Sequence, residues 1–247
     1  MSVSDYKVAL VTGASSGVGG ACVRALRNAG VEVVALARRE DRLEKLAKET
    51  GCETLVMDLT DTDLIYEKLA GRQFDILINN AGLGRDHEGF FSSTASEIDE
   101  VIDLNVGASI HVVHAVASGM VDRGYGHVVQ IGSITGLYPL GMPGYSATKG
   151  AIHSFSQNLR LEFKGTRVRQ TEICPGRIQT EFFDNAFKTL EQKEQFLSGF
   201  TPLVPENIAE AVMYALDTPW SVNVSMIELT PTEQIPGGVS VQKAREI

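Results

Sequence analysis

The chain has 247 residues, of which 43% are hydrophobic and 21% are charged, a composition typical of soluble globular proteins. Its formal net charge of −9 argues against general binding to nucleic acid or acidic membranes, so a phosphate-bearing ligand would need a local basic cluster. No apolar run approaches the roughly 20 residues of a membrane span, and residues 1–13 lead into a strand-like run without a signal-peptide core, so we expect a cytoplasmic protein.

Seven short apolar runs, in chain order, have the length and residue types of buried strands. They cover residues 8–12, 31–37, 54–58, 74–80, 127–133, 168–176 and 225–231. Helix-like segments, such as residues 19–30 and 42–50, lie between them. This alternation predicts an α/β fold with a sheet covered by helices on both faces. Because the chain contains no repeat, low-complexity tract or linker, we expect a single domain over residues 1–247.

A glycine-rich turn joins the first predicted strand to the first helix. Gly13, Gly17 and Gly19 have the spacing G-x-x-x-G-x-G. Glycine permits a tight turn and lets the backbone approach a pyrophosphate at the helix N-terminus. A structural turn without a ligand is the alternative, but the strand before and the helix after favour a dinucleotide site.

Two arginines stand where the second strand ends, at the position where an NAD-binding unit usually has a carboxylate for the ribose. Arg38 and Arg39 suit the 2′-phosphate of NADP instead, because a guanidinium binds phosphate in a bidentate manner. Glu40 and Asp41 follow, and we expect them to begin the next helix. The alternative is that both arginines are merely solvated at a helix start. We therefore predict NADP as cofactor, with NAD not excluded.

Polar residues also end the third and fourth predicted strands, on the ligand edge of such a sheet. Asp58 would accept a hydrogen bond from an adenine amino group, or it would cap the helix that begins near Asp61. The turn Asn-Asn-Ala-Gly at 79–82 would line the adenosine pocket.

The segment YSATK places Tyr145 and Lys149 one helical turn apart. Together with TGASSGVG (12–19), NNAG (79–82), Asn105, Ser133 and PGRIQT (175–180), this ordered set resembles the short-chain dehydrogenase/reductase family over essentially the whole chain. The resemblance implies a Rossmann-type fold with about seven strands and an oxidoreductase that interconverts an alcohol and a carbonyl. It also implies assembly, usually as a homotetramer with a homodimer as the alternative, through long helices such as those around 95–122 and 145–165.

The resemblance gives each member of the set a role. Tyr145 would be the acid/base, although a free tyrosine has a pKa of about 10, and the charges of Lys149 and the oxidised nicotinamide would lower that value. Lys149 would also bind the nicotinamide ribose, Ser133 would donate to the substrate oxygen, and Asn105 would anchor water in a proton relay. The expected cofactor-binding residues are Gly13, Ser15, Ser16, Gly17, Val18, Gly19, Arg38, Arg39, Asp58, Leu59, Asn80, Ala81, Gly82, Tyr145, Lys149, Pro175, Gly176, Ile178 and Thr180.

The aromatic-rich segment 181–203 interrupts the alternation of strands and helices after the sixth strand. We interpret it as a substrate lid, with an ordinary pair of packed helices as the alternative. Residues 37–47 and 221–234 resemble the branch that contains serine/3-hydroxy acid dehydrogenases and small-aldehyde reductases. A small anionic substrate would need a cation, for which Arg177, Arg85 and His87 are the candidates, each with a solvent-exposed charge as the alternative.

Other functions stay open at this point. The apolar stretch 136–144 would suit a bulkier, neutral ketone, and a nucleotide-sugar epimerase or dehydratase would hold its cofactor permanently. A non-catalytic dinucleotide sensor would be expected to have lost part of the set, and all four of Asn105, Ser133, Tyr145 and Lys149 are present.

One pair of histidines has a spacing that can bind metal, but the sequence indicates no complete metal site. Cys22, Cys52 and Cys174 are too few and too scattered for a disulfide framework or a metal cluster, and we interpret Cys22 and Cys174 as small core residues. His111 and His114 are three apart on a predicted helix, but no third ligand is evident, so we expect surface or interface histidines and no metal.

Overall fold

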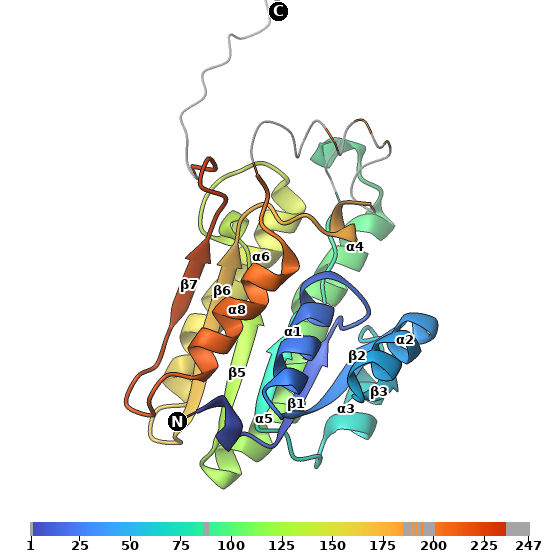
Figure 1. The fold of residues 1–247 in the computed structure, drawn as a ribbon. Helices are drawn as coiled ribbons and strands as arrows, with labels where there is room; N and C mark the ends of the chain where they lie inside the picture. Colours follow the sequence, from blue (N-terminus) through green and yellow to red (C-terminus); the bar gives the residue numbers. More distant parts are fainter. Residues whose placement is uncertain are drawn as a thin grey trace, which may run out of the picture.

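The computed structural model describes residues 2–85, 89–184 and 201–235, together with the isolated positions 189, 191 and 194. Its seven strands form one parallel sheet in the order β3-β2-β1-β4-β5-β6-β7 (Figure 1). The strands are β1 Val8–Thr12, β2 Glu32–Ala37, β3 Glu53–Val56, β4 Ile76–Asn79, β5 Gly126–Ile131, β6 Val168–Pro175 and β7 Met226–Leu229. The predicted α/β fold with about seven strands is confirmed.

Helices cover both faces of this sheet. They are α1 Gly17–Asn28, α2 Glu40–Thr50, α3 Thr62–Leu69, α4 Ala95–Ile102, α5 Ser109–Arg123, α6 Pro143–Glu162 and α8 Pro205–Leu216. One hydrophobic core lies between the sheet and α1, α2 and α8, and a second lies between the sheet and α3, α5 and α6. Alternate side chains of each strand point to opposite faces, so a strand such as β1 serves both cores and reads as a continuous apolar run.

The strand order reverses between β1 and β4, because the chain passes from β3 at one edge back to the middle of the sheet. Open α/β sheets bind ligands at such a switch point, outside the carboxyl ends of the strands. The strand arrows in Figure 1 point to the end of the molecule where α4 and the N-terminal end of α6 lie. The fold therefore places the glycine-rich turn, Asp58, Ser133 and residues 175–180 at one edge.

The expectation that no segment resembles a membrane span needs correction. The continuous helix Ala95–Arg123 comprises α4, a π-helical turn at Asp103–Ala108 and α5. By length and composition it could cross a membrane, because an 18-residue stretch of it has a mean hydropathy of 1.4. Half of that stretch is buried inside the protein, where α5 contacts α3, β4 and β5. Packing between the sheet and its neighbouring helix accounts for the apolar side chains, such as Val112, Val116 and Met120.

Candidate active site

A cavity of about 820 Å³ runs along the carboxyl ends of the strands. Nearly all of the site residues expected from the sequence line it: Gly13, Ser15, Ser16, Gly17, Val18, Arg38, Arg39, Asp58, Leu59, Asn80, Ala81, Gly82, Ser133, Tyr145, Lys149, Pro175, Gly176, Arg177, Ile178 and Thr180. Gly19 and Asn105 do not line the cavity but contact residues that do: Gly19 packs against Gly13, and Asn105 bonds to Leu83. Segments as far apart in the chain as those of Gly13 and Gln234 thus meet in one elongated space.

Glycine is required in the turn between β1 and α1. Gly13 and Gly17 have φ values of +64° and +52°, which side-chain-bearing residues rarely adopt. A Cβ on Gly19 would collide with the carbonyl oxygen of Gly13, so the first turn of α1 packs directly on the loop. Asn80 fastens this loop to β4, since its Nδ2 donates to the carbonyl of Thr12 at 3.0 Å. The backbone is therefore held with the N-terminus of α1 directed at the cavity.

The arginine end of the cavity is a network of charged and hydroxyl groups. Arg39 donates to the hydroxyls of Ser15 (3.1 Å from Nε) and Ser16 (2.6 Å from Nη2). It also pairs with Glu181 at 3.2 Å, and the Arg42 guanidinium contacts the same carboxylate. These charge-assisted hydrogen bonds, that of Arg42 first, lower the pKa of Glu181. Arg39 is therefore not simply solvated, because it joins the glycine-rich turn to the segment after β6.

Asp58 lies at the same end, after β3. The helix-cap alternative is wrong: Asp61 caps α3, accepting from the Leu64 amide at 3.0 Å. The Asp58 carboxylate accepts instead from the amide and hydroxyl of Thr60 at 3.0 and 2.9 Å, and Arg38 lies 3.5 Å away. Burial opposes ionisation of Asp58, but these hydrogen bonds and the Arg38 charge still lower its pKa. Glu40 and Asp41 occupy the first turn of α2, as expected.

Tyr145 and Lys149 lie one turn apart on α6 and are both buried, with exposed fractions of 8% and 7%. The Lys149 ammonium donates to the carbonyl of Ile131 at 2.9 Å and lies 5.8 Å from the Tyr145 ring centroid. Ser133 begins the turn after β5, and its Oγ accepts from the amide and hydroxyl of Thr135 at 3.2 and 3.1 Å. Because both of these bonds are accepted, the Ser133 hydroxyl keeps its own proton for donation, and it donates to the Tyr145 oxygen.

In the structure the pKa of Tyr145 is shifted upward, opposite to the lowering expected from the sequence. Burial raises the pKa of Tyr145 above its usual value, opposed by a hydrogen bond from Ser133. Burial also lowers the pKa of Lys149 to about 8, although the negative charge of Glu172 partly offsets this effect. In the protein alone, Tyr145 is thus held as a neutral phenol. A positive charge beside it, in addition to Lys149, is needed to favour the phenolate.

Asn105 lies in the π-helical turn and links two elements. Its Oδ1 accepts from the Leu83 amide and its Nδ2 donates to the Leu83 carbonyl, both at 2.8 Å. The same Nδ2 donates to the Thr148 hydroxyl at 3.1 Å. The side chain therefore fixes the loop after β4 against α6, next to Lys149. π-Helical turns are frequent at functional sites, and this one was not predicted from the sequence.

Apolar groups line the part of the cavity beside Tyr145. Leu140, Met142 and Phe182 line it, and the Phe182 ring centroid lies 5.5 Å from that of Tyr145. Arg177 is half-buried in the same wall, and burial lowers its pKa. Arg85 pairs instead with Glu100 at 2.9 Å. His87, the third candidate cation, lies outside the described residues.

Only the two ends of the predicted lid fall within the described residues. Glu181–Asp184 form a short 3-10 helix after β6, and Leu203 pairs with Ile178 in an isolated parallel bridge. The amide of Gln179 donates to the Leu203 carbonyl at 2.7 Å, so the segment leaves and returns at one point above the cavity. Most of residues 185–200 lie outside the described part of the chain.

Some site residues were missed from the sequence. Gln234 lines the cavity from beyond β7, and its Oε1 accepts from the Arg177 amide at 2.9 Å. Glu181 was assigned only to the lid. Neither position follows from spacing, because each depends on a tertiary contact. His111 and His114 both meet the Tyr66 hydroxyl through Nδ1, at 3.0 and 3.2 Å.

Proteins of similar sequence and structure are known, and they share a family with this chain. The family model of short chain dehydrogenases matches residues 7–191. The NADP-dependent 3-hydroxy acid dehydrogenase of Salmonella typhi is 36% identical over 247 residues, covering 96% of this chain and 100% of that protein. Sulfoacetaldehyde reductase 2 of Chromohalobacter salexigens is 32% identical, covering 96% and 98%. The closed form of a serine dehydrogenase complexed with NADP⁺ superposes with a TM-score of 0.91 at 35% identity, covering 96% of this chain and 100% of that one.

Proposed function

We propose a substrate class and a set of catalytic roles for this chain, which belongs to the short-chain dehydrogenase family. The protein is an NADP-dependent oxidoreductase that interconverts an alcohol and a carbonyl. The substrate that its site suits best is a small 3-hydroxy acid or the corresponding small anionic carbonyl compound. The observation that carries this proposal is the meeting of Tyr145, Ser133 and Arg177 in the cavity that also holds the glycine-rich turn.

The residues of the cavity fit NADP along its whole length. The N-terminus of α1 and the hydroxyls of Ser15 and Ser16 suit a pyrophosphate, while Arg38 and Arg39 suit a 2′-phosphate. NADP, when bound, supplies the hydride acceptor or donor and, in its oxidised form, a positive charge. Lys149 would hold the nicotinamide ribose, and the backbone at Pro175–Ile178 with the Thr180 hydroxyl would hold the far end.

Ser133 and Tyr145 would act on the substrate oxygen. The Ser133 hydroxyl, oriented by Thr135, would donate a hydrogen bond to this oxygen and hold it beside the Tyr145 hydroxyl. In alcohol oxidation Tyr145 accepts the hydroxyl proton as phenolate, and in reduction it returns this proton. Lys149 and the oxidised cofactor would together supply the positive charge that offsets the burial of Tyr145.

Arg177 would select the anionic group of the substrate. It is half-buried and lines the cavity that Tyr145 also lines, where a substrate carboxylate would accept a charge-assisted hydrogen bond. Losing such a bond costs about 1.5–3 kcal/mol, so we expect Arg177→Ala to raise KM for 3-hydroxybutyrate about tenfold or more. Arg177→Lys should retain part of the affinity, and KM for a neutral alcohol should not change. An unchanged KM for the hydroxy acid would remove this assignment.

A bulkier neutral ketone is the second candidate substrate, favoured by Leu140, Met142 and Phe182 on the wall next to Tyr145. A panel of L-serine, 3-hydroxypropionate, 3-hydroxybutyrate, hydroxysulfonates and cyclic or aromatic alcohols, oxidised with NADP⁺, separates the two. Turnover confined to the small acids supports the first class, whereas turnover confined to apolar alcohols supports the second.

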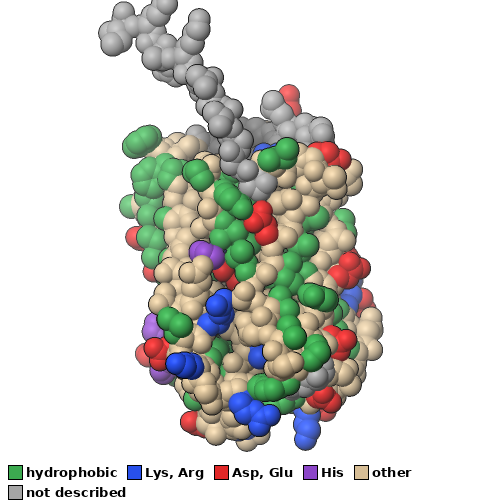
Figure 2. Space-filling view, turned by 90° about the vertical axis from the view of Figure 1, so that its left-hand side faces the viewer, with side chains coloured by type: hydrophobic (Ala, Val, Ile, Leu, Met, Phe, Trp, Pro, Cys, Tyr) green, Lys and Arg blue, Asp and Glu red, His purple; other side chains and the backbone are tan. Residues whose placement is uncertain are grey.

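We further propose that the chain forms a homotetramer in the cytoplasm. β7 is an edge strand with exposed side chains such as Met226, and apolar side chains run lengthwise along the face that carries it (Figure 2). Unpaired edges and apolar patches of this kind favour association. The three cysteines are free and buried, which suits a reducing compartment. Light scattering of the purified protein tests the assembly, and a monomer would contradict it.

A further inference from the structure

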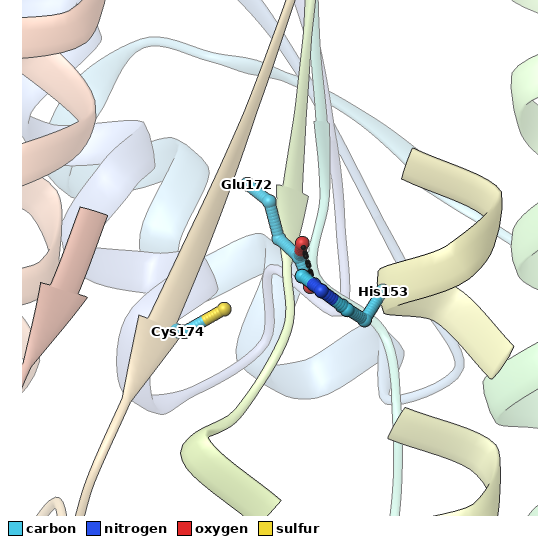
Figure 3. Close-up of side chains that lie close together, drawn as sticks. All are labelled: His153, Glu172 and Cys174. Atoms are coloured by element: carbon cyan, nitrogen blue, oxygen red, sulfur yellow. Dashed lines mark hydrogen bonds and ion pairs between the residues drawn. The ribbon is translucent and has the colours of Figure 1, made fainter. Parts of the chain in front are cut away.

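His153, Glu172 and Cys174 form a cluster that the proposed reaction does not use (Figure 3). Glu172 and Cys174 are two apart on β6, so their side chains point to the same face of the sheet, where His153 of α6 meets them. The Nδ1 of His153 lies 2.8 Å from a carboxylate oxygen of Glu172. The nitrogen, sulfur and oxygen donors of the three side chains all lie within 4.8 Å of one another.

His153 and Glu172 border a cavity of about 420 Å³ that is separate from the cofactor cavity and lined mostly by residues with polar side chains. Glu172, Gln170 and Ser156 line it and are nearly fully buried, with exposed fractions of 2%, 1% and 1%. Both amide atoms of Gln170 and the Ser156 hydroxyl have no hydrogen-bond partner among the described residues, and the Glu172 carboxylate meets the Cys174 thiol as well as His153. Buried polar groups without partners are costly and uncommon, so this cavity is built to hold a polar or charged occupant.

We propose that His153, Glu172 and Cys174 bind a divalent metal ion of the zinc class. An imidazole, a thiolate and a carboxylate are the donors that Zn²⁺ takes, whereas Mg²⁺ and Ca²⁺ prefer oxygen ligands alone. Three protein ligands leave a fourth position, which water from the cavity fills. The cavity is lined by two carboxylates, those of Glu172 and Glu228, and by one guanidinium, that of Arg160, so their formal charges sum to −1 and favour a cation.

The surrounding hydrogen bonds allow the ligands to adopt the required protonation states. Gln157 lies 2.7 Å from His153 Nε2, so its amide supports the ring at the nitrogen that would not bind the metal. On binding, the ring proton moves from Nδ1 to Nε2, where the Gln157 carbonyl accepts it after the amide turns over. Cys174 is fully buried, so its thiol proton would leave by way of Glu172 to water in the adjoining cavity, and the sulfur would bind as thiolate. Binding therefore releases one proton for each metal ion.

The position of the cluster connects it to the catalytic group. A Cβ on Gly132, the residue before Ser133, would collide with Glu172 Oε1, so the carboxylate packs directly against this turn. The Glu172 charge also opposes the effect of burial on Lys149. A metal ion that neutralises Glu172 removes this support and favours the uncharged amine. Occupancy of the metal site is thus expected to inhibit turnover, a consequence that rests on the proposed function.

Titration of the purified full-length chain with Co²⁺ tests the site without any substrate. A thiolate ligand gives Co²⁺ an intense charge-transfer absorption, and one equivalent should saturate it, with Zn²⁺ displacing the ion. Cys174→Ser should abolish this absorption, and His153→Gln should weaken binding at least about tenfold. Cys52→Ser and His111→Gln are the matched controls and should bind as the parent chain does.

NADPH binding by each variant, followed by nucleotide fluorescence, checks that it is folded. His153→Gln carries the test alone if Cys174→Ser does not fold, because His153 lies on a helix at the rim of the cluster. Absence of a thiolate band in the parent chain, or its persistence in Cys174→Ser, overturns the site. Zn²⁺ inhibition of the parent chain but not of His153→Gln supports the link to catalysis. Binding without inhibition overturns that link alone, and failure of the substrate panel leaves the Co²⁺ result unaffected.

Discussion

Lys149 is held beneath the cavity by the carbonyl of Ile131, and its environment sets its charge. Burial lowers its pKa to about 8 from the model-compound value of 10.5. Its proposed roles need the ammonium, which is lost as the pH rises through about 8. Tyr145 does not contribute an ionisation there, because burial raises its pKa further from neutrality. The protonation states of Tyr145 and Lys149 therefore depend on how far burial removes water from each side chain.

The pH dependence of kcat/KM for NADP⁺ should therefore show a fall with a midpoint near pH 8, since this parameter reports ionisations of the free enzyme. Lys149→Arg should lower the rate and remove this limb, because a guanidinium stays protonated. A wild-type profile that is flat from pH 7 to about 9.5 would contradict the assignment.

The lowered pKa of Lys149 also makes the stability of the protein depend on pH. The folded pKa of Lys149 lies below the unfolded value, so the folded chain binds fewer protons between about pH 8 and 10.5. Lys149 therefore contributes a free energy of unfolding that increases with pH across this window.

The short 3-10 helix at Glu181–Asp184 follows β6 and contacts the arginine end of the cavity through Glu181. Glu181 pairs with Arg42 and with Arg39, and the Arg39 guanidinium also donates to the hydroxyls of Ser15 and Ser16. A carboxylate on these guanidinium groups competes with a phosphate for the same donors.

Glu181→Gln should consequently tighten NADPH binding by about two- to fivefold, the range expected for partly exposed ion pairs. NADH binding should change little, because that cofactor lacks the 2′-phosphate. Glu44→Gln, which makes the same charge change on an exposed face of α2, serves as control. Fluorescence titration with both nucleotides measures the effect, and weaker NADPH binding by Glu181→Gln would argue that the carboxylate does not compete.

Elements differ in how well the sequence predicts them. The strands were predictable because buried parallel strands are continuous apolar runs, and the sites at their ends followed from the fold. The π-helical turn at Asp103–Ala108 could not be predicted, since its sequence is ordinary helix and its shape depends on the bonds of Asn105 to Leu83 and Thr148. Asp58 illustrates the same limit. An aspartate before a helix suggests an N-cap, but Asp61, three residues later, is the N-cap of α3.

The whole molecule is held together at the end opposite the cavity by a buried cation. Arg169 of β6 donates to the carbonyls of Leu216 and Thr218 and to the Tyr6 hydroxyl, and it is 3% exposed. These bonds join the N-terminal segment and the end of α8 to β6 of the sheet. No sequence pattern indicates them, because the partners are 47–163 residues away.

Arg169→Met should lower the free energy of unfolding by about 3 kcal/mol or more, because it leaves several buried carbonyl groups without donors. Lys164→Met, a nearby surface change, should stay within about 0.5 kcal/mol. Chemical denaturation of both variants provides the comparison, and equal stabilities would show that Arg169 does not fasten these segments.

The same distinction applies to the site as a whole. The glycine-rich turn, the arginine pair and the tyrosine–lysine pair were found from spacing, since each motif is local or lies at a strand end. The contacts of Glu181, Gln234 and the His153–Glu172–Cys174 cluster are not local, and only the packed sheet and helices bring these side chains together.

Oxidation of 3-hydroxybutyrate and L-serine with NADP⁺ by the parent chain and by Tyr145→Phe tests the central claim most directly. We expect the parent chain to reduce NADP⁺, and Tyr145→Phe to lose at least about a hundredfold in kcat with an unchanged Kd for NADP⁺. Tyr138→Phe, which removes a hydroxyl bonded to Glu228 and distant from the proton transfer, should retain its turnover. Substantial turnover by Tyr145→Phe would contradict the assignment of Tyr145 as the catalytic acid/base.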